Sequence, residues 1–188
     1  MRIIIIGFLL FYCTSSNAQS PKEQFGFHVA PHLEIHELGS EITLSAGFYA
    51  GFHYRRFHYS AYYTQTTQAF TPNQGELSVS DLEIRFSERS LGCSYHHPTN
   101  EYLRVIIGIR IGDGTITSKY DLNGQAMEDS DQVFQFRPEI GTSIRLNPSM
   151  LLYFSVGYRS VYGIDNGLFL DQKDINSISS NVGLSFVF

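Results

Sequence analysis

The chain has 188 residues, of which 43% are apolar and only 16% are charged, and its formal net charge is −5. The length indicates a single domain, and the acidic balance excludes a general attraction to nucleic acid. The 15 phenylalanines and 12 tyrosines exclude an intrinsically disordered chain. The charged fraction lies well below the roughly 25% of soluble domains, and ten of the 13 basic residues are arginine. A structural explanation has to account for this arginine bias.

The N-terminal segment has the pattern of a secretory signal peptide. Arg2 supplies the positive charge, residues 3–12 are an apolar run, and residues 16–18 place small side chains before a cleavage site. The apolar run is too short to cross a bilayer. We therefore expect cleavage between Ala18 and Gln19, which leaves one domain over residues 19–188.

The two cysteines define an alternative to this leader and exclude an internal disulfide. Lipidation of Cys13 is disfavoured, because the bulky Phe11 and Tyr12 stand where a lipidation signal carries small residues. After cleavage Cys93 is the single cysteine, so it has no partner within the chain. Cys93 lies on the apolar side of the strand pattern described in the next paragraph. We therefore expect it to act as a small apolar residue on the outer face.

From residue 24 onward, apolar and polar residues alternate with a period of two, which is typical of β-strands that have two different faces. The pattern predicts strands over residues 25–35, 42–54, 57–64, 82–95, 103–111, 134–146, 152–162 and 178–188. In the fourth strand the alternation changes phase, and we expect a β-bulge near Glu88–Ser90 to join its two halves. These lengths suit the roughly 9–11 residues of a tilted transmembrane strand.

The predicted connections alternate between short and long. Residues 54–57, 96–101 and 146–149 form tight turns, whereas residues 36–41, 67–77, 113–132 and 163–174 form the longer connections. This layout is typical of an outer-membrane β-barrel with periplasmic turns and extracellular loops. The fold class is therefore all-β, an eight-stranded antiparallel up-and-down transmembrane β-barrel with both mature termini in the periplasm.

The residues on the polar face of the strands indicate whether that face points into the lumen or outward. A soluble lipocalin-like barrel would turn its apolar face inward, whereas a membrane barrel turns that face to lipid. Arginine forks onto carboxylates inside a crowded lumen better than lysine does, which explains the arginine bias. We expect a lumen charge network of Glu34, Glu83, Arg85, Arg104, Arg110, Arg137, Glu139, Arg145 and Arg159. We also expect four lumen histidines, His28, His32, His53 and His58.

The C-terminal residues 181–188 carry the most specific signal. Val182, Leu184, Phe186 and a terminal Phe188 alternate with small or polar residues, as in the signal by which the barrel-assembly machinery recognises its substrates. Together with the leader, the chain resembles the small eight-stranded outer-membrane β-barrel proteins of the Bacteroidota type, the PorT-like group. The resemblance implies insertion by that machinery, residence in the cell outer membrane, and contact with lipid and lipopolysaccharide. It implies no single activity, because this fold hosts several.

Candidate metal sites are weak in the sequence, and we expect no metal or other cofactor. His28, His32 and His36 are spaced by four, but in a strand such residues lie about 13 Å apart, too far to share an ion. His53 and His58 face each other if the turn between them is tight, yet no third ligand is defined. The acidic residues between Asp121 and Asp131 lack the spacing of an EF-hand, so a solvated loop is the simpler interpretation.

An enzymatic reading rests on His58 and Ser60, which share a face as Ser-His catalysis requires. Barrel lipid A deacylases carry a His-x-Ser-Asn signature, but Ala61 follows Ser60 here, and both residues fall on the lumen side. We therefore expect no enzyme and no catalytic residue. The expected function is a structural or interaction role through extracellular loops. The alternatives are a narrow channel for small solutes and, behind it, a lipid-modifying enzyme.

Overall fold

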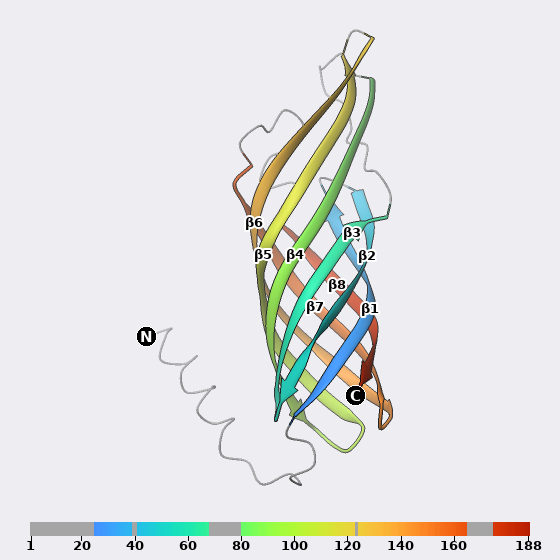
Figure 1. Cartoon of the computed structure of the whole chain (residues 1–188), viewed down its shortest axis with the longest axis vertical. Helices are drawn as coiled ribbons and strands as arrows, with labels where there is room; N and C mark the ends of the chain where they lie inside the picture. The colour runs from blue at the N-terminus through green and yellow to red at the C-terminus, as the bar shows by residue number, and fades with distance from the viewer. Residues whose placement is uncertain (1–24, 39–40, 68–79, 123, 165–174) are drawn as a thin grey trace, which may run out of the picture.

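A computed structural model describes residues 25–38, 41–67, 80–122, 124–164 and 175–188. These residues form a closed barrel in which eight antiparallel strands pair in sequence order and β1 closes against β8 (Figure 1). The strands are β1 (Phe25–Leu38), β2 (Glu41–Tyr54), β3 (Phe57–Thr66), β4 (Ser80–Pro98), β5 (Leu103–Leu122), β6 (Gln125–Asn147), β7 (Met150–Tyr162) and β8 (Ser177–Val187). The predicted fold class is confirmed. The leader with its cleavage site, most of loop 67–77 and most of loop 163–174 lie outside the described residues.

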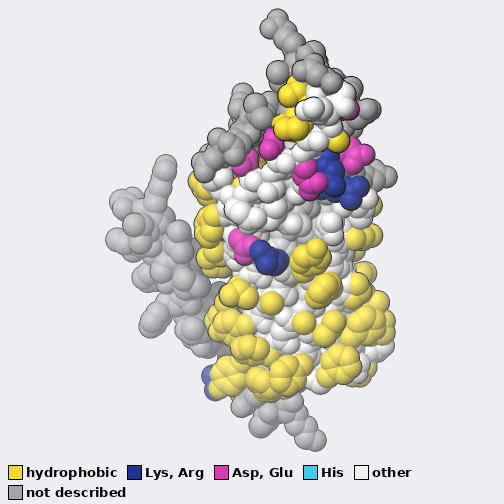
Figure 2. Space-filling view, turned by 45° about the horizontal axis from the view of Figure 1, so that its top comes forward, with side chains coloured by type: hydrophobic (Ala, Val, Ile, Leu, Met, Phe, Trp, Pro, Cys, Tyr) yellow, Lys and Arg dark blue, Asp and Glu magenta, His cyan; other side chains and the backbone are white. Residues whose placement is uncertain are grey.

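The alternating sequence pattern becomes an alternating burial pattern with the polar side inward. In β1, His28, His32 and Glu34 are buried, whereas Phe25 and Phe27 are more than half exposed. The other strands expose large apolar side chains in the same way, and these side chains form a belt around the lower part of the barrel (Figure 2). A soluble barrel would show the opposite arrangement, so the lipocalin-like alternative is excluded. No helix in the described part of the chain is long and apolar enough to cross a membrane.

Aromatic rings strengthen the lower rim of this belt, where the tight turns lie. Phe25 stacks on Phe52 with centroids 5.9 Å apart, and Phe52 stacks on Tyr59 at 5.2 Å. The ring centroids of Phe57 on β3 and Tyr95 on β4 lie 5.3 Å apart. Such girdles mark the membrane–water boundary in outer-membrane barrels.

The upper rim of the belt is marked by an exposed ion pair. Arg89 of β4 and Asp113 of β5 are register partners on the outer face, with nitrogen and oxygen 2.7 Å apart. Below this pair the outer positions of β5 are apolar, whereas the pairs above it include Lys119–Glu128 at 3.2 Å. The outer face therefore changes from lipid-compatible to water-compatible at the Arg89–Asp113 pair.

The structure corrects the prediction for β4. The register of β4 against β3 and β5 runs without interruption through Glu88–Ser90, so the expected bulge is absent, and the irregularity lies between Ser80 and Glu83 instead. Leu82, Ile84 and Phe86 consequently point inward, and Glu83 and Arg85 are exposed on the outside. The prediction of Glu83 and Arg85 as lumen residues is wrong. The alternation changes phase because this part of β4 lies above the apolar belt. There the outer face is polar, and the apolar side chains point into the lumen.

The predicted loop over residues 113–132 is instead a continuation of the barrel wall. β5 and β6 stay paired from Asp113↔Phe134 up to Leu122↔Gln125, and β4 rises beside them, pairing with β5 as far as Ser80↔Asp121 (Figure 1). Gly124 adopts a φ of +83°, a conformation that favours glycine, and its N–H donates to the Asp121 carboxylate at 2.6 Å. The prediction of a solvated loop here is wrong. Its alternating Ser, Thr, Asp and Lys residues belong to a strand pair that faces water.

The C-terminal strand shows the expected alternation. Val182 and Phe186 are exposed on the apolar belt, and Leu184 is partly exposed. The terminal Phe188 exchanges two backbone hydrogen bonds with Phe27, at 3.2 and 2.9 Å, which extends the seam that closes the barrel. Recognition of this strand by the assembly machinery stays a prediction.

Candidate functional site

The inward-facing residues of β1 mark four successive levels of the lumen. His28 lies in a histidine level nearest the tight turns, Ala30 in an aromatic level, Glu34 in a charged level and Leu38 in an apolar level. Side chains from all eight strands fill these levels, as expected for a barrel this narrow. The lumen is therefore the first place to look for chemistry.

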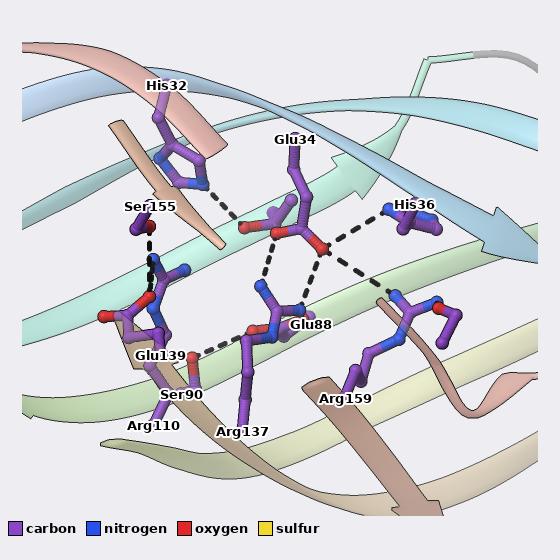
Figure 3. Close-up of polar contacts among 12 residues, drawn as sticks. His32, Glu34, His36, Glu88, Ser90, Arg110, Arg137, Glu139, Ser155 and Arg159 are labelled. Carbon is purple, nitrogen blue, oxygen red and sulfur yellow. Dashed lines mark hydrogen bonds and ion pairs between the residues drawn. The ribbon is translucent and has the colours of Figure 1, made fainter. Parts of the chain in front are cut away.

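Glu34, Arg137 and Glu88 form the centre of the charged level (Figure 3). Both amino groups of Arg137 donate to the two carboxylate oxygens of Glu34, at 2.7 and 2.8 Å, and one also donates to Glu88 at 2.9 Å. Ser90 donates to the other oxygen of Glu88 at 3.0 Å. All three charged side chains are fully buried. One guanidinium thus joins β1, β4 and β6 across the lumen.

Arg110 and Glu139 form a second buried pair beside the first. The guanidinium of Arg110 donates to Glu139 at 2.8 Å, and the Ser155 hydroxyl donates to the same carboxylate oxygen at 3.3 Å. The guanidinium also lies 4.0 Å from the ring centroid of Tyr62, a favourable cation–π position. This pair joins the charged level to the aromatic level, which comprises Ala30, Tyr49, Ile106, Tyr153 and the partly buried Tyr62.

Arg159 is the third arginine of the charged level and lies next to the apolar level. Its guanidinium lies 3.9 Å from Glu34, 3.4 Å from the Ile175 carbonyl and 4.9 Å from the ring centroid of Phe86. His36 lies 3.3 Å from Glu34 on the same side. The level then holds three buried carboxylates and three buried guanidinium groups, Glu34, Glu88, Glu139, Arg110, Arg137 and Arg159. Their formal charges cancel, which is what makes such deep burial tolerable.

Above the charged level, buried apolar side chains close the lumen. The cluster comprises Leu38, Leu82, Ile84, Phe86, Ile116, Tyr120, Val133, Val161 and Ile175. It contains the three β4 residues that the sequence interpretation had placed on the outside. These side chains separate the charged level from the end of the barrel that carries the long hairpin.

The predicted lumen residues fall into three groups. Glu34, Arg110, Arg137, Glu139 and Arg159 meet in the charged level. Arg104 and Arg145 lie apart from them, at the opening near the tight turns. Glu83 and Arg85 lie outside. Glu88 was not predicted as a lumen residue, because it lay within the expected bulge at Glu88–Ser90. The polar alternation of Glu88 with Ser90 was the available signal.

Six of the seven histidines point into the lumen. Nε2 of His28 hydrogen-bonds the Ser60 hydroxyl at 2.8 Å, and Nε2 of His32 hydrogen-bonds Thr64 at 3.0 Å. His53 and His58 are register partners with ring centroids 5.1 Å apart. The other two inward histidines, His36 and His96, were not singled out as lumen residues.

A cavity of about 190 Å³ opens beneath the histidine level, at the end of the barrel with the tight turns. His53, His58 and His96 line it together with Arg104 and the C-terminal strand. The rings of His58 and His96 stack in parallel, with centroids 3.5 Å apart. The histidine level is therefore reachable from this end of the barrel.

Comparisons with known proteins agree on the fold. No protein-family model matches the sequence, and no curated protein sequence matches it. Neisserial surface protein A superposes with a TM-score of 0.59 at 14% identity, covering 88% of this chain and 96% of its own. Ail, the attachment invasion locus protein of Yersinia pestis, gives 0.53 at 16% identity over 87% and 97%.

A major outer membrane protein from Thermus thermophilus gives a TM-score of 0.58 at 11% identity, covering 87% of this chain and 99% of its own. Identities this low establish the shape of the chain and carry no activity with them. The register, the apolar belt and the structural neighbours agree that this chain has the fold of the small eight-stranded outer-membrane β-barrels.

Proposed function

We propose that the protein is a non-enzymatic, non-conducting barrel of the outer membrane that presents the β5–β6 hairpin at the cell surface for contact with a partner. The observation that carries the proposal is the change of the outer face at the Arg89–Asp113 pair. From Asp113 of this pair to Leu122, β5 runs through ten residues, which is roughly 30 Å of extended chain. A wall that continues so far beyond the lipid offers a rigid surface for contact.

The edge of β6 makes the hairpin suitable for binding. Register partners in β7 begin only at Phe134, so residues 125–133 of β6 pair with β5 alone among the described strands. An unpaired strand edge can accept an extended segment from another chain. The segment 113–132 contains five acidic residues and one lysine, so it favours a partner with a basic surface. Ail, which shares the fold, is named for attachment.

The orientation in the proposal follows from the apolar belt and from the predicted leader. The tight turns and both termini of the mature chain would face the periplasm, and the long hairpin would face the medium. Membership of the PorT-like group, contact with lipopolysaccharide and insertion by the barrel-assembly machinery remain parts of the proposal that rest on the resemblance and on the C-terminal strand.

We expect the hairpin to be necessary for attachment but not for barrel formation. Replacing residues 115–132 with Asn-Gly joins the register partners Gly114 and Val133 by a two-residue turn. A non-adherent Gram-negative host that displays the intact protein should bind immobilised basic matrix proteins in a salt-sensitive manner, and the shortened variant should not. Both proteins should show the heat-dependent gel mobility of a folded barrel.

Orientation is controlled in the same cells. A cysteine at Met127 in the hairpin should react with a membrane-impermeant maleimide on intact cells, whereas a cysteine at Asn100 in a tight turn should react only after permeabilisation. Attachment that survives removal of the hairpin, or that is equally strong on the polyanion heparin, would contradict the proposed surface.

We expect no discrete ion conductance from the purified protein in planar bilayers. The side chains of the charged level and of the apolar cluster are buried and fill two successive levels of the lumen, which favours a closed lumen. The alternative, a narrow solute channel, predicts single-channel steps that change in Glu139→Ala. Reproducible steps of this kind in the wild-type protein would rule out the closed-lumen proposal.

The enzymatic alternative gains little from the geometry. His28 and Ser60 do form a histidine–serine contact at 2.8 Å. However, Nδ1 of His28 has no hydrogen-bond partner in the described part of the chain, so no carboxylate orients the ring as a catalytic base requires. The pair also lies inside the lumen rather than facing lipid, where a lipid substrate would be.

A further inference from the structure

We propose that His28, His53 and His58 form a binding site for a divalent transition metal, of the zinc class, at the periplasmic end of the lumen. Each of the three side chains offers one ring nitrogen, and these three nitrogens all lie within 4.8 Å of one another. The residues come from β1, β2 and β3, so neighbouring strands converge on one point. Nothing in the proposed attachment role requires this cluster.

The strand register produces the cluster. His53 pairs directly with His58 across the β2–β3 turn, and the inward position opposite His53 on β1 is Gly26. A Cβ atom at Gly26 would lie 2.5 Å from Cε1 and 3.0 Å from Nε2 of His53, so the glycine provides space for that ring. Gly51 likewise pairs with His28. The missing side chain at Gly26 makes room for the His53 ring, and the strand register brings the three imidazoles together.

Two ring nitrogens of these histidines have no hydrogen-bond partner in the described part of the chain. Nδ1 of His28 and Nε2 of His58 are buried and make no hydrogen bond within the described part of the chain. The side chains of His28 and His58 are only 2% and 8% exposed. Leaving a buried polar atom without a partner costs about 1–3 kcal/mol. A metal coordinated by Nδ1 of His28 and Nε2 of His58 would satisfy both atoms at once.

The chemistry of three imidazoles selects the ion. Neutral imidazole suits zinc, copper and nickel, whereas calcium and magnesium require oxygen ligands. Tetrahedral zinc holds nitrogen at about 2.0–2.1 Å, so the rings must approach by rotation about their side-chain bonds. Ring centroids 5.1 Å apart for His53–His58 and 5.3 Å apart for His28–His58 place them within reach of such a rotation.

The fourth coordination position faces the periplasmic cavity. That cavity is about 190 Å³ and is lined by His53 and His58, so water or an exogenous ligand has access to the ion. Arg55, Arg56, Arg104 and Arg145 line the same cavity. Their positive charge opposes a dication and favours an anionic fourth ligand. We therefore infer a three-histidine site with an open position, the arrangement of exchangeable rather than closed structural sites.

The test uses the full-length mature barrel, purified with a tag free of histidine and held in detergent. Cobalt(II) serves as the probe, because its visible absorption reports tetrahedral nitrogen coordination, and zinc(II) should displace it. We expect one cobalt per chain in the wild type. Loss of a supporting residue around a metal ligand already lowers affinity by about 10- to 100-fold, so His53→Gln and His58→Gln should lower it at least as much.

Two histidines provide matched controls. His97→Gln removes an exposed histidine on the outer face, and His32→Gln removes a buried histidine from the lumen above the site. Both should bind cobalt as the wild type does. Gly26→Ala keeps all three ligands but displaces the His53 ring, so it should weaken binding as well. Heat-dependent gel mobility shows for each variant that the barrel is folded.

The outcomes separate cleanly. Stoichiometric binding that His53→Gln abolishes and His97→Gln preserves supports the site. No binding by the wild type overturns it, as does binding that survives both His53→Gln and His58→Gln. If His58→Gln fails to fold, the partly exposed His53 and the Gly26→Ala variant decide the question. Equal loss in the His32→Gln control would indicate a general effect of lumen histidines and would also overturn it.

Discussion

Replacing Arg137 with alanine is expected to destabilise the barrel by about 3–5 kcal/mol, the usual effect of removing one partner from a buried ion pair. The substitution removes three hydrogen bonds at 2.7–2.9 Å and leaves Glu34 and Glu88 facing each other without the cation that joins them. Urea-induced unfolding of the barrel in lipid vesicles, followed by gel mobility, measures the change. Arg137→Lys should recover little, because a lysine cannot fork onto two carboxylates.

Arg89→Ala is the matched control for this prediction. The Arg89–Asp113 pair has the same 2.7 Å separation, but its side chains are 68% and 54% exposed. Exposed pairs contribute at most about 1 kcal/mol. Equal destabilisation by Arg89→Ala and Arg137→Ala would mean that water reaches the charged level as freely as it reaches the outer surface.

Ile84→Asp is expected to destabilise the barrel by at least about 3 kcal/mol, because it places a carboxylate without a partner in the apolar cluster. Ile84 is 1% exposed and packs among the residues that close the lumen above Arg159. The neighbouring Arg85→Asp introduces the same residue on the outer face, where Arg85 is largely exposed. That variant should change stability by less than about 1 kcal/mol. Urea unfolding of the two variants side by side measures both.

The two possible orientations of β4 predict different results for this pair. If the bulge near Glu88–Ser90 existed, Arg85 would lie in the lumen, and Arg85→Asp would be the damaging substitution. A large loss of stability in Arg85→Asp would therefore contradict the continuous register of β4.

Much of the architecture follows from the chain's alternation. The two faces of β1, β5, β7 and β8 and the three tight turns could be predicted, because side chains of a strand alternate strictly between its faces. The arginine content also predicted a polar lumen with Glu34, Arg110, Arg137, Glu139 and Arg159 inside, which is where the structure places them. These features depend on neighbouring residues only.

Other features needed information from outside each strand. Alternation shows that Ile84 and Arg85 lie on opposite faces, but it does not show which face meets lipid and which meets water. That depends on the height of the residue relative to the apolar belt, and above the Arg89–Asp113 pair the outer face carries exposed ion pairs. The same reason explains why residues 113–132 looked like a loop. Their polar alternation suits a strand pair outside the bilayer.

The sequence also could not predict which lumen side chains contact one another. Glu34 and Arg137 are 103 residues apart, and the third histidine of the proposed metal site, His28, lies on a different strand from the predicted His53–His58 pair. The sequence by itself determined a barrel with eight two-faced strands, because alternation is a local property. Only the tertiary structure decided which charges and which histidines meet, because strand register and barrel closure set distances across the lumen.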